Sequence, residues 1–153
     1  MLDFDRKIKE TKQQTLPIKI DEDLKCKIQD WESNNIFYGL LPVVGDSMTC
    51  NNEKSIPNGS KILISEIDIN KPFNLKSEIK NPNWFLLLPT NKPLALVIRN
   101  NKGQEQCVVK EIFIVDNIQG VIGLRSYNPK HKDAFISIDF IKKVFKVHKI
   151  FID

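Results

Sequence analysis

The chain has 153 residues, of which 41% are hydrophobic and 27% are charged, and its formal net charge is +4. These are ordinary values for one soluble globular domain, which would bury about two-thirds of its unfolded surface. No apolar run approaches the roughly 18–20 residues that a membrane span requires, which argues against a membrane protein. The charged start of the sequence lacks the apolar centre of a signal peptide, so we expect a cytoplasmic location.

Cysteine and histidine are sparse. Cys26, Cys50 and Cys107 are odd in number and far apart, and no Cys-x-x-Cys pair occurs. This spacing predicts neither a disulfide framework nor a zinc ribbon. Only two histidines are present, without a His-Glu-x-x-His pattern. We therefore expect no metal ion and no cofactor.

Residues 1–33 are polar, rich in Lys, Asp, Glu and Gln, and contain no glycine. Pro17 interrupts any single long helix. We expect an N-terminal arm, extended or helical, with an extended piece near 16–20, followed by a folded domain over 34–153. The arm has too few apolar residues to build a helix-turn-helix unit, so direct nucleic-acid binding is not expected.

From Ile36 the sequence changes to short runs rich in β-branched residues, separated by turn signals such as Pro57-Asn58-Gly59 and Asn128-Pro129. Residues 94–115, with an Asn/Gly loop at 100–103, have the pattern of a β-hairpin. The pattern predicts a mainly β fold with a folded-over or barrel-like sheet. The expected strands are 36–44, 61–67, 84–88, 94–99, 106–115, 119–125, 134–138 and 144–152.

The end of the chain is basic. Residues 125–153 hold seven Lys or Arg and three Asp. A solvated strand face explains this excess most simply. A surface for an acidic partner or for nucleic acid is the alternative.

Lys110 lies in a strongly apolar run. Residues two apart in a strand share a face. Val108 and Ile112 therefore lie on the face of Lys110, and the apolar residues Val109 and Phe113 lie on the other face. A strand that is apolar on both faces is expected to be buried. A buried lysine pairs with an acid (here Glu111 or Asp46), extends to the surface, or loses its charge.

A serine lies in the tight turn Gly45-Asp46-Ser47-Met48. A serine hydroxyl is a weak nucleophile until a base removes its proton, and a neutral lysine can act as that base. Ser47 and Lys110 are therefore candidates for a Ser-Lys dyad. The simpler alternatives are a capping role for Ser47 and a core-filling role for Met48.

Four segments, taken in order, resemble the LexA-like peptidase family, which includes LexA, UmuD and the C-terminal domains of phage repressors. They are Val-Gly-Asp-Ser-Met at 44–48, Ser-Ile-Pro-Asn-Gly-Ser-Lys-Ile-Leu-Ile at 55–64, Cys-Val-Val-Lys-Glu-Ile at 107–112 and Leu-Arg-Ser-Tyr-Asn-Pro at 124–129. The resemblance covers 36–152 and implies a LexA-like peptidase fold.

The resemblance also implies the role of each site residue. Ser47 is expected to be the nucleophile and Lys110 the general base. The amides of Ser47 and Met48 would bind the oxyanion, while Gly45 and Asp46 would shape and support the turn. The implied activity is peptide-bond hydrolysis in SOS-type or phage-repressor-type regulation. The implied partners are a second copy of the chain and a RecA-type filament, a regulator or a polymerase.

Two of the departures from the family bear on the candidate site. Self-cleaving members are cut at Ala-Gly or Cys-Gly, but neither pair occurs here and the first alanine is Ala95. Ordinary self-cleavage is therefore not expected. The 62 residues between Ser47 and Lys110 exceed the usual gap, which places an insertion near 68–93 that would cover the cleft or serve a partner.

The absent cleavage site favours an alternative function, in which the fold is retained without catalysis. The chain would then be a dimerisation or partner-docking module of a transcriptional regulator or an error-prone polymerase. The titration of Lys110 separates the two functions, because only a peptidase needs a depressed lysine pKa. Membrane signal peptidases match the sequence less well, since they carry an N-terminal membrane anchor and a proline two residues after the serine.

Overall fold

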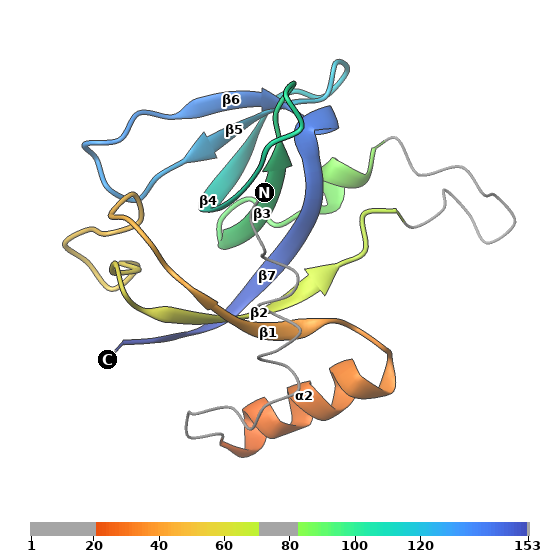
Figure 1. Cartoon of the computed structure of the whole chain (residues 1–153), viewed down its shortest axis with the longest axis vertical. Coiled ribbons are helices and arrows are strands. Elements are labelled where there is room, and N and C mark those ends of the chain that lie inside the picture. The colour runs from red at the N-terminus through yellow and green to blue at the C-terminus, as the bar shows by residue number, and fades with distance from the viewer. Residues whose placement is uncertain (1–20, 71–82, 153) are drawn as a thin grey trace, which may run out of the picture.

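The computed structural model describes residues 21–70 and 83–152. Within these ranges the chain forms a seven-stranded antiparallel sheet in the order β1-β2-β7-β3-β4-β5-β6, with the helix α2 at one end (Figure 1). The mainly β prediction is confirmed. The strands are β1 (Tyr38–Pro42), β2 (Lys61–Ile67), β3 (Pro93–Arg99), β4 (Glu105–Asp116), β5 (Val121–Arg125), β6 (Ala134–Ser137) and β7 (Ile141–Phe151).

The predicted hairpin over 94–115 is present as the β3–β4 pair, with Leu94 opposite Lys110. Gly103 has φ +77° in its loop, a conformation that glycine adopts without steric cost. The predicted strand at 84–88 is wrong, because this segment forms the 3₁₀ helix η1 (Trp84–Leu87). Trp84 and Phe85 are both buried whereas Leu87 is 79% exposed, so the apolar residues do not alternate as a strand requires.

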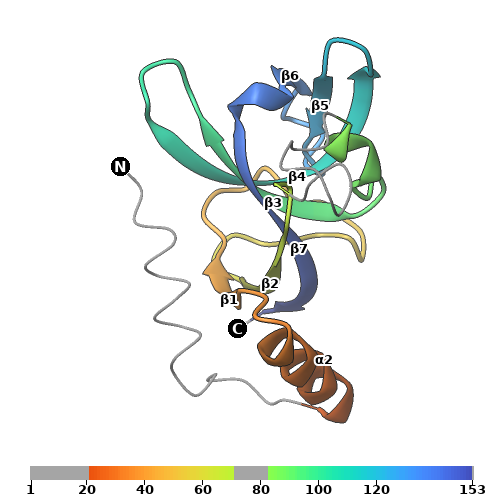
Figure 2. The same cartoon turned by 90° about the vertical axis from the view of Figure 1, so that its right-hand side faces the viewer.

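The long strand β7 joins the two halves of the sheet (Figures 1 and 2). Register shifts interrupt its pairing with both β2 and β3. Such bulges increase the local twist, which folds the sheet over on itself. Two apolar clusters fill the concave sides: one surrounds Ile62, Ile64 and Phe145, and the other surrounds Leu94 and Ile112.

The helix α2 (Glu22–Ser33) is the described part of the predicted arm, and residues 16–20 lie outside the described ranges. Asp21 caps the helix by accepting a hydrogen bond from the Leu24 amide at 2.8 Å. Leu24 and Trp31 bury one face of the helix against Leu63 and its neighbours in the sheet. No helix in the described ranges is long and apolar enough to cross a membrane.

His148 on β7 lies where α2 meets the sheet. Its Nε2 is 2.6 Å from the hydroxyl oxygen of Ser65, and its ring centroid is 4.5 Å from that of Trp31. Burial, with smaller contributions from Lys146 and Lys27, lowers the pKa of His148 to about 4. The folded protein therefore holds this histidine neutral at neutral pH.

Neutral His148 gives a pH-dependent contribution to stability. The unfolded pKa is 6.5 and the folded pKa is about 4, so the contribution is complete above about pH 6.5 and is lost as the pH falls towards 4. As the pH falls from about 6.5 to about 4, we expect the free energy of unfolding of the wild type to fall relative to that of His148→Gln. Urea unfolding at several pH values measures that difference, and a difference that does not change with pH would contradict the prediction.

The strand β4 differs from the expected buried strand, since Ile112 is its only fully buried residue. The reason is that β5 pairs only with Glu111–Asp116. The outer edge of β4 before Glu111 is left without a neighbouring strand among the described residues. Lys110 is consequently half-buried at an open edge.

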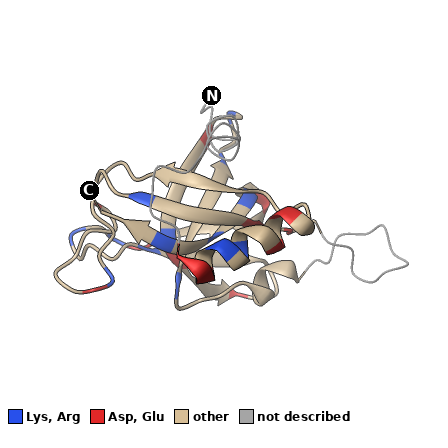
Figure 3. Cartoon of the chain, turned by 90° about the horizontal axis from the view of Figure 1, so that it is seen from below, with Lys and Arg blue, Asp and Glu red and all other residues tan. Residues whose placement is uncertain are grey.

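The basic end of the chain follows β7, where Lys142, Lys146 and Lys149 are exposed. Buried residues such as Val144 and Phe145 lie between them. Acidic and basic positions are interspersed in Figure 3. This distribution fits a solvated strand face better than a concentrated basic surface.

Candidate active site

The turn that carries Ser47 follows β1 and is held from one side by the turn at 57–59. Gly45 has φ +95°, which a residue with a Cβ rarely adopts. The Gly45 amide donates to the Asn58 side-chain oxygen at 3.0 Å, and the Gly59 amide donates to the Val43 carbonyl at 2.9 Å. These bonds fix where the chain leaves the sheet and begins the serine turn.

From the other side, Asn128 holds the same turn. Its amide donates to the Ser47 carbonyl at 2.9 Å, and its side-chain nitrogen donates to the Asp46 carbonyl at 3.0 Å. Met48 is only 2% exposed and fills the core beneath the turn, with its sulfur 3.4 Å from the Tyr127 amide. The backbone of Ser47 is thus restrained by two loops that are distant in sequence.

Lys110 lies on β4 beside the end of β5. Its amine donates to the Ser126 hydroxyl oxygen at 2.7 Å. Burial lowers the pKa of Lys110 below 10.5. The hydrogen bond directs the amine, and the lowered pKa increases the fraction that is neutral and able to accept a proton.

Neither of the two acids considered as partners pairs with Lys110. Glu111 accepts a hydrogen bond from the Tyr127 hydroxyl at 2.9 Å and lies 4.0 Å from Arg125. Asp46 lies 2.9 Å from His131 instead. Within the described ranges, no carboxylate forms an ion pair with Lys110, so no neighbouring negative charge favours its protonated form.

Ser47 and Lys110 border the same cleft, although they come from segments far apart in the chain. The cleft has a volume of about 480 Å³, within the range of ligand sites. Most of the other residues that line the cleft are apolar. The lining comprises Leu41, Pro42, Val43, Val44, Gly45, Asp46, Ser47, Met48, Gln106, Cys107, Val108, Val109, Lys110 and His131.

Within the described residues no hydrogen bond joins Ser47 to Lys110, whose amine donates to Ser126. Catalytic hydrogen bonds are often long in unliganded enzymes and shorten when substrate binds. The arrangement therefore supplies a half-exposed hydroxyl and a half-buried amine on one cleft. These are the two groups that a serine nucleophile and its lysine base require.

Sequence reasoning assigned no role to Ser126, Asn128 or His131. Ser126 and Asn128 fall in a segment that resembles the LexA-like family, but their partners depend on the register of β4 and β5. Glu111 pairs with Arg125, which brings the next residue, Ser126, beside Lys110. His131, one of only two histidines, belongs to no recognisable sequence pattern. Its partner Asp46 is 85 positions away in the sequence, so no local pattern connects the two residues.

Within residues 21–70 and 83–152, no group of three or more His, Cys, Asp or Glu side chains could hold a metal ion. Cys26, Cys50 and Cys107 form no disulfide bond within the described residues. Cys107 borders the cleft, on the strand that carries Lys110.

The chain matches no protein-family model and no curated protein sequence. Two features of the chain bear on what this site could do. One is the geometry around Ser47, Lys110 and Ser126. The other is the ordered set of segments that resembles the LexA-like family.

Proposed function

We propose that this chain is a LexA-like peptidase-fold protein that hydrolyses peptide bonds through a Ser47–Lys110 dyad. The observation that carries the proposal is the cleft that both residues border. Support comes from Lys110, whose pKa is lowered by burial and whose amine is held by Ser126. A lysine with these properties is suited to act as a general base.

In the proposed reaction, neutral Lys110 takes the proton of the Ser47 hydroxyl as its oxygen attacks the peptide carbonyl. The negative charge that develops on the carbonyl oxygen is stabilised by the backbone amides of Ser47 and Met48. Protonated Lys110 then gives its proton to the leaving amine, and an ester forms on Ser47. Water, deprotonated by Lys110, hydrolyses the ester and restores the hydroxyl.

The strand edges around the cleft indicate an extended peptide as substrate. Residues 105–110 of β4 pair with β3 on one side, while β5 begins to pair only at Glu111. The opposite wall is the segment 41–44 at the end of β1. An extended peptide can form main-chain hydrogen bonds with a free strand edge and place alternate side chains against apolar walls. Because the chain contains no Ala-Gly or Cys-Gly pair, we propose that the substrate is another polypeptide.

The proposal includes a regulatory role of the SOS or phage-repressor type. The proposed partners are a second copy of the chain and a RecA-type filament, a regulator or a polymerase. This part of the proposal rests on the resemblance alone. The alternative is a non-catalytic dimerisation or docking module. One observation favours the module, namely that the chain contains no Ala-Gly or Cys-Gly pair. The two functions differ in whether any peptide bond is cut.

The pH dependence of cleavage tests the proposal. Purified full-length chain is incubated with casein between about pH 7 and about pH 11, a range that spans lysine titration, and new N-termini are identified by mass spectrometry. Only the neutral amine can accept the serine proton, so the rate should rise with pH. It should level off below 10.5, because burial lowers the pKa of Lys110. The absence of new termini at every pH would favour the docking module.

A further inference from the structure

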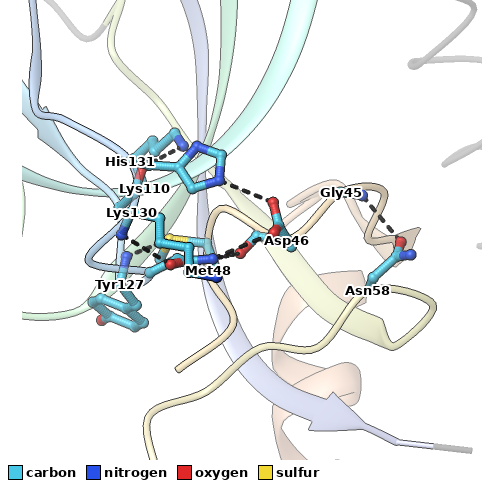
Figure 4. A network of polar contacts seen from close by, with 10 residues as sticks. Gly45, Asp46, Met48, Asn58, Lys110, Tyr127, Lys130 and His131 are labelled. Carbon is cyan, nitrogen blue, oxygen red and sulfur yellow. Dashed lines mark hydrogen bonds and ion pairs between the residues drawn. The ribbon is translucent and has the colours of Figure 1, made fainter. Parts of the chain in front are cut away.

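A second pair of side chains borders the cleft beside the dyad. His131 Nε2 lies 2.9 Å from Asp46 Oδ1 (Figure 4). Asp46 directly precedes Ser47, whereas His131 follows β5 in the loop that also contains Ser126. The contact therefore joins the turn that carries the nucleophile to the loop that holds the lysine.

The loop that presents His131 is itself ordered. The His131 amide donates to the Asn128 carbonyl at 3.1 Å, and the Lys130 amide donates to the Asn128 side-chain oxygen at 3.0 Å. The Asp46 carbonyl accepts bonds from the Asn128 side chain and from the Thr49 amide, both at 3.0 Å. Both the backbone and the carboxylate of Asp46 are thus held, which restricts the orientation of the next residue, Ser47.

The contact has little to contribute to the stability of the fold. The side chains of His131 and Asp46 are 42% and 65% exposed, and contacts between such exposed side chains contribute little to stability. A small displacement of a nucleophile has a much larger effect on rate, up to about 100-fold for 1 Å. The expected effect of the contact is therefore on catalysis rather than on folding.

We propose that His131 and Asp46 are positioning residues that hold the Ser47 turn at the cleft through their mutual contact. The inference rests on the proposed peptidase function and extends it to two residues that neither attack the substrate nor accept the serine proton. Ionised Asp46 can only accept a hydrogen bond, so His131 must present an N–H at Nε2. Glutamine at position 131 can place an N–H near the same point, whereas alanine cannot.

The test compares His131→Ala, Asp46→Ala and the double variant with His131→Gln, using casein cleavage at increasing substrate concentration. Each alanine variant should lower kcat by about 10-fold and leave KM within about 2-fold. Asp46 Oδ2 also accepts from the Asn128 side-chain nitrogen at 3.4 Å. The double variant should therefore be no slower than Asp46→Ala, because His131→Ala removes only a contact that Asp46→Ala already removes. His131→Gln should retain most of the activity. Lys132→Ala, an exposed neighbour outside the cleft, should behave as the wild type.

Two kinetic outcomes would overturn the inference. A raised KM with unchanged kcat would mean that the pair contacts substrate instead of positioning Ser47. Equal kcat in all variants would mean that the contact has no part in the reaction. Matching thermal unfolding temperatures would show that the variants remain folded.

Hydrogen exchange of residues 44–50 separates failure of the inference from failure of the proposed function. If the wild type cleaves nothing, the peptidase proposal fails, but the positioning of the turn is still measurable. Faster amide exchange in His131→Ala and Asp46→Ala, with no change in Lys132→Ala, would support the positioning role. Unchanged exchange in every variant would contradict it.

Discussion

Replacing Ser47 by alanine is expected to reduce casein cleavage by at least about 1,000-fold, because the substitution removes the only atom that can form the ester intermediate. The fold should be unaffected. Ser47 is partly exposed, and its restraint comes from backbone bonds to its carbonyl, which alanine retains. Mass spectrometry of the products measures the loss, and thermal unfolding checks that the variant is folded.

Ser137→Ala is a matched control for Ser47→Ala. Ser137 caps the short helix η2 (Ile138–Phe140) and does not border the cleft. Its substitution should leave the cleavage rate unchanged. Equal cleavage by wild type and Ser47→Ala would show that another group, or a contaminating peptidase, cuts the substrate.

Replacing Lys110 by methionine is expected to reduce cleavage by about 100- to 10,000-fold, the usual effect of losing a general base. Methionine retains much of the length and apolar character of lysine but cannot accept a proton. The variant should be at least as stable as the wild type, because methionine avoids the desolvation that opposes the charged form of Lys110. Cleavage rates and urea unfolding curves measure the two effects.

Lys102→Met provides the control for Lys110→Met, since Lys102 is exposed in the β3–β4 turn. It should cleave at the wild-type rate. Combining Ser47→Ala with Lys110→Met should be no worse than Ser47→Ala alone, because in the proposed reaction the two groups act in one step. If Lys110→Met retains the wild-type rate, the lysine is not the base.

Much of the sheet could be predicted because its strands are bounded by strong turn signals. The hairpin β3–β4 and the strand β2 follow directly from apolar runs between Asn, Gly and Pro residues. The segment at 84–88 could not be assigned by the same reasoning. Its apolar residues suit a strand or a short helix equally, and tertiary packing of Trp84 and Phe85 decides between them.

The candidate site was only partly predictable. The order of the motifs identified Ser47 and Lys110, and the structure brings both to one cleft. The partner of Lys110 could not be found from composition, because Ser126 reaches it only through the β4–β5 register. The half-buried state of Lys110 was also missed, since it depends on where β5 stops pairing.

Acylation of Ser47 tests the Ser47–Lys110 dyad most directly and does not require the natural substrate. The protein is treated with p-nitrophenyl acetate near pH 9, between neutrality and the ordinary lysine pKa of about 10.4, and the acetyl group is located by peptide mass mapping. We predict an acetyl ester on Ser47 in the wild type and at least about 100-fold slower labelling of Ser47 in Lys110→Met. Acetyl groups found only on surface amines, or equal labelling of Ser47 in both proteins, would contradict the proposed dyad.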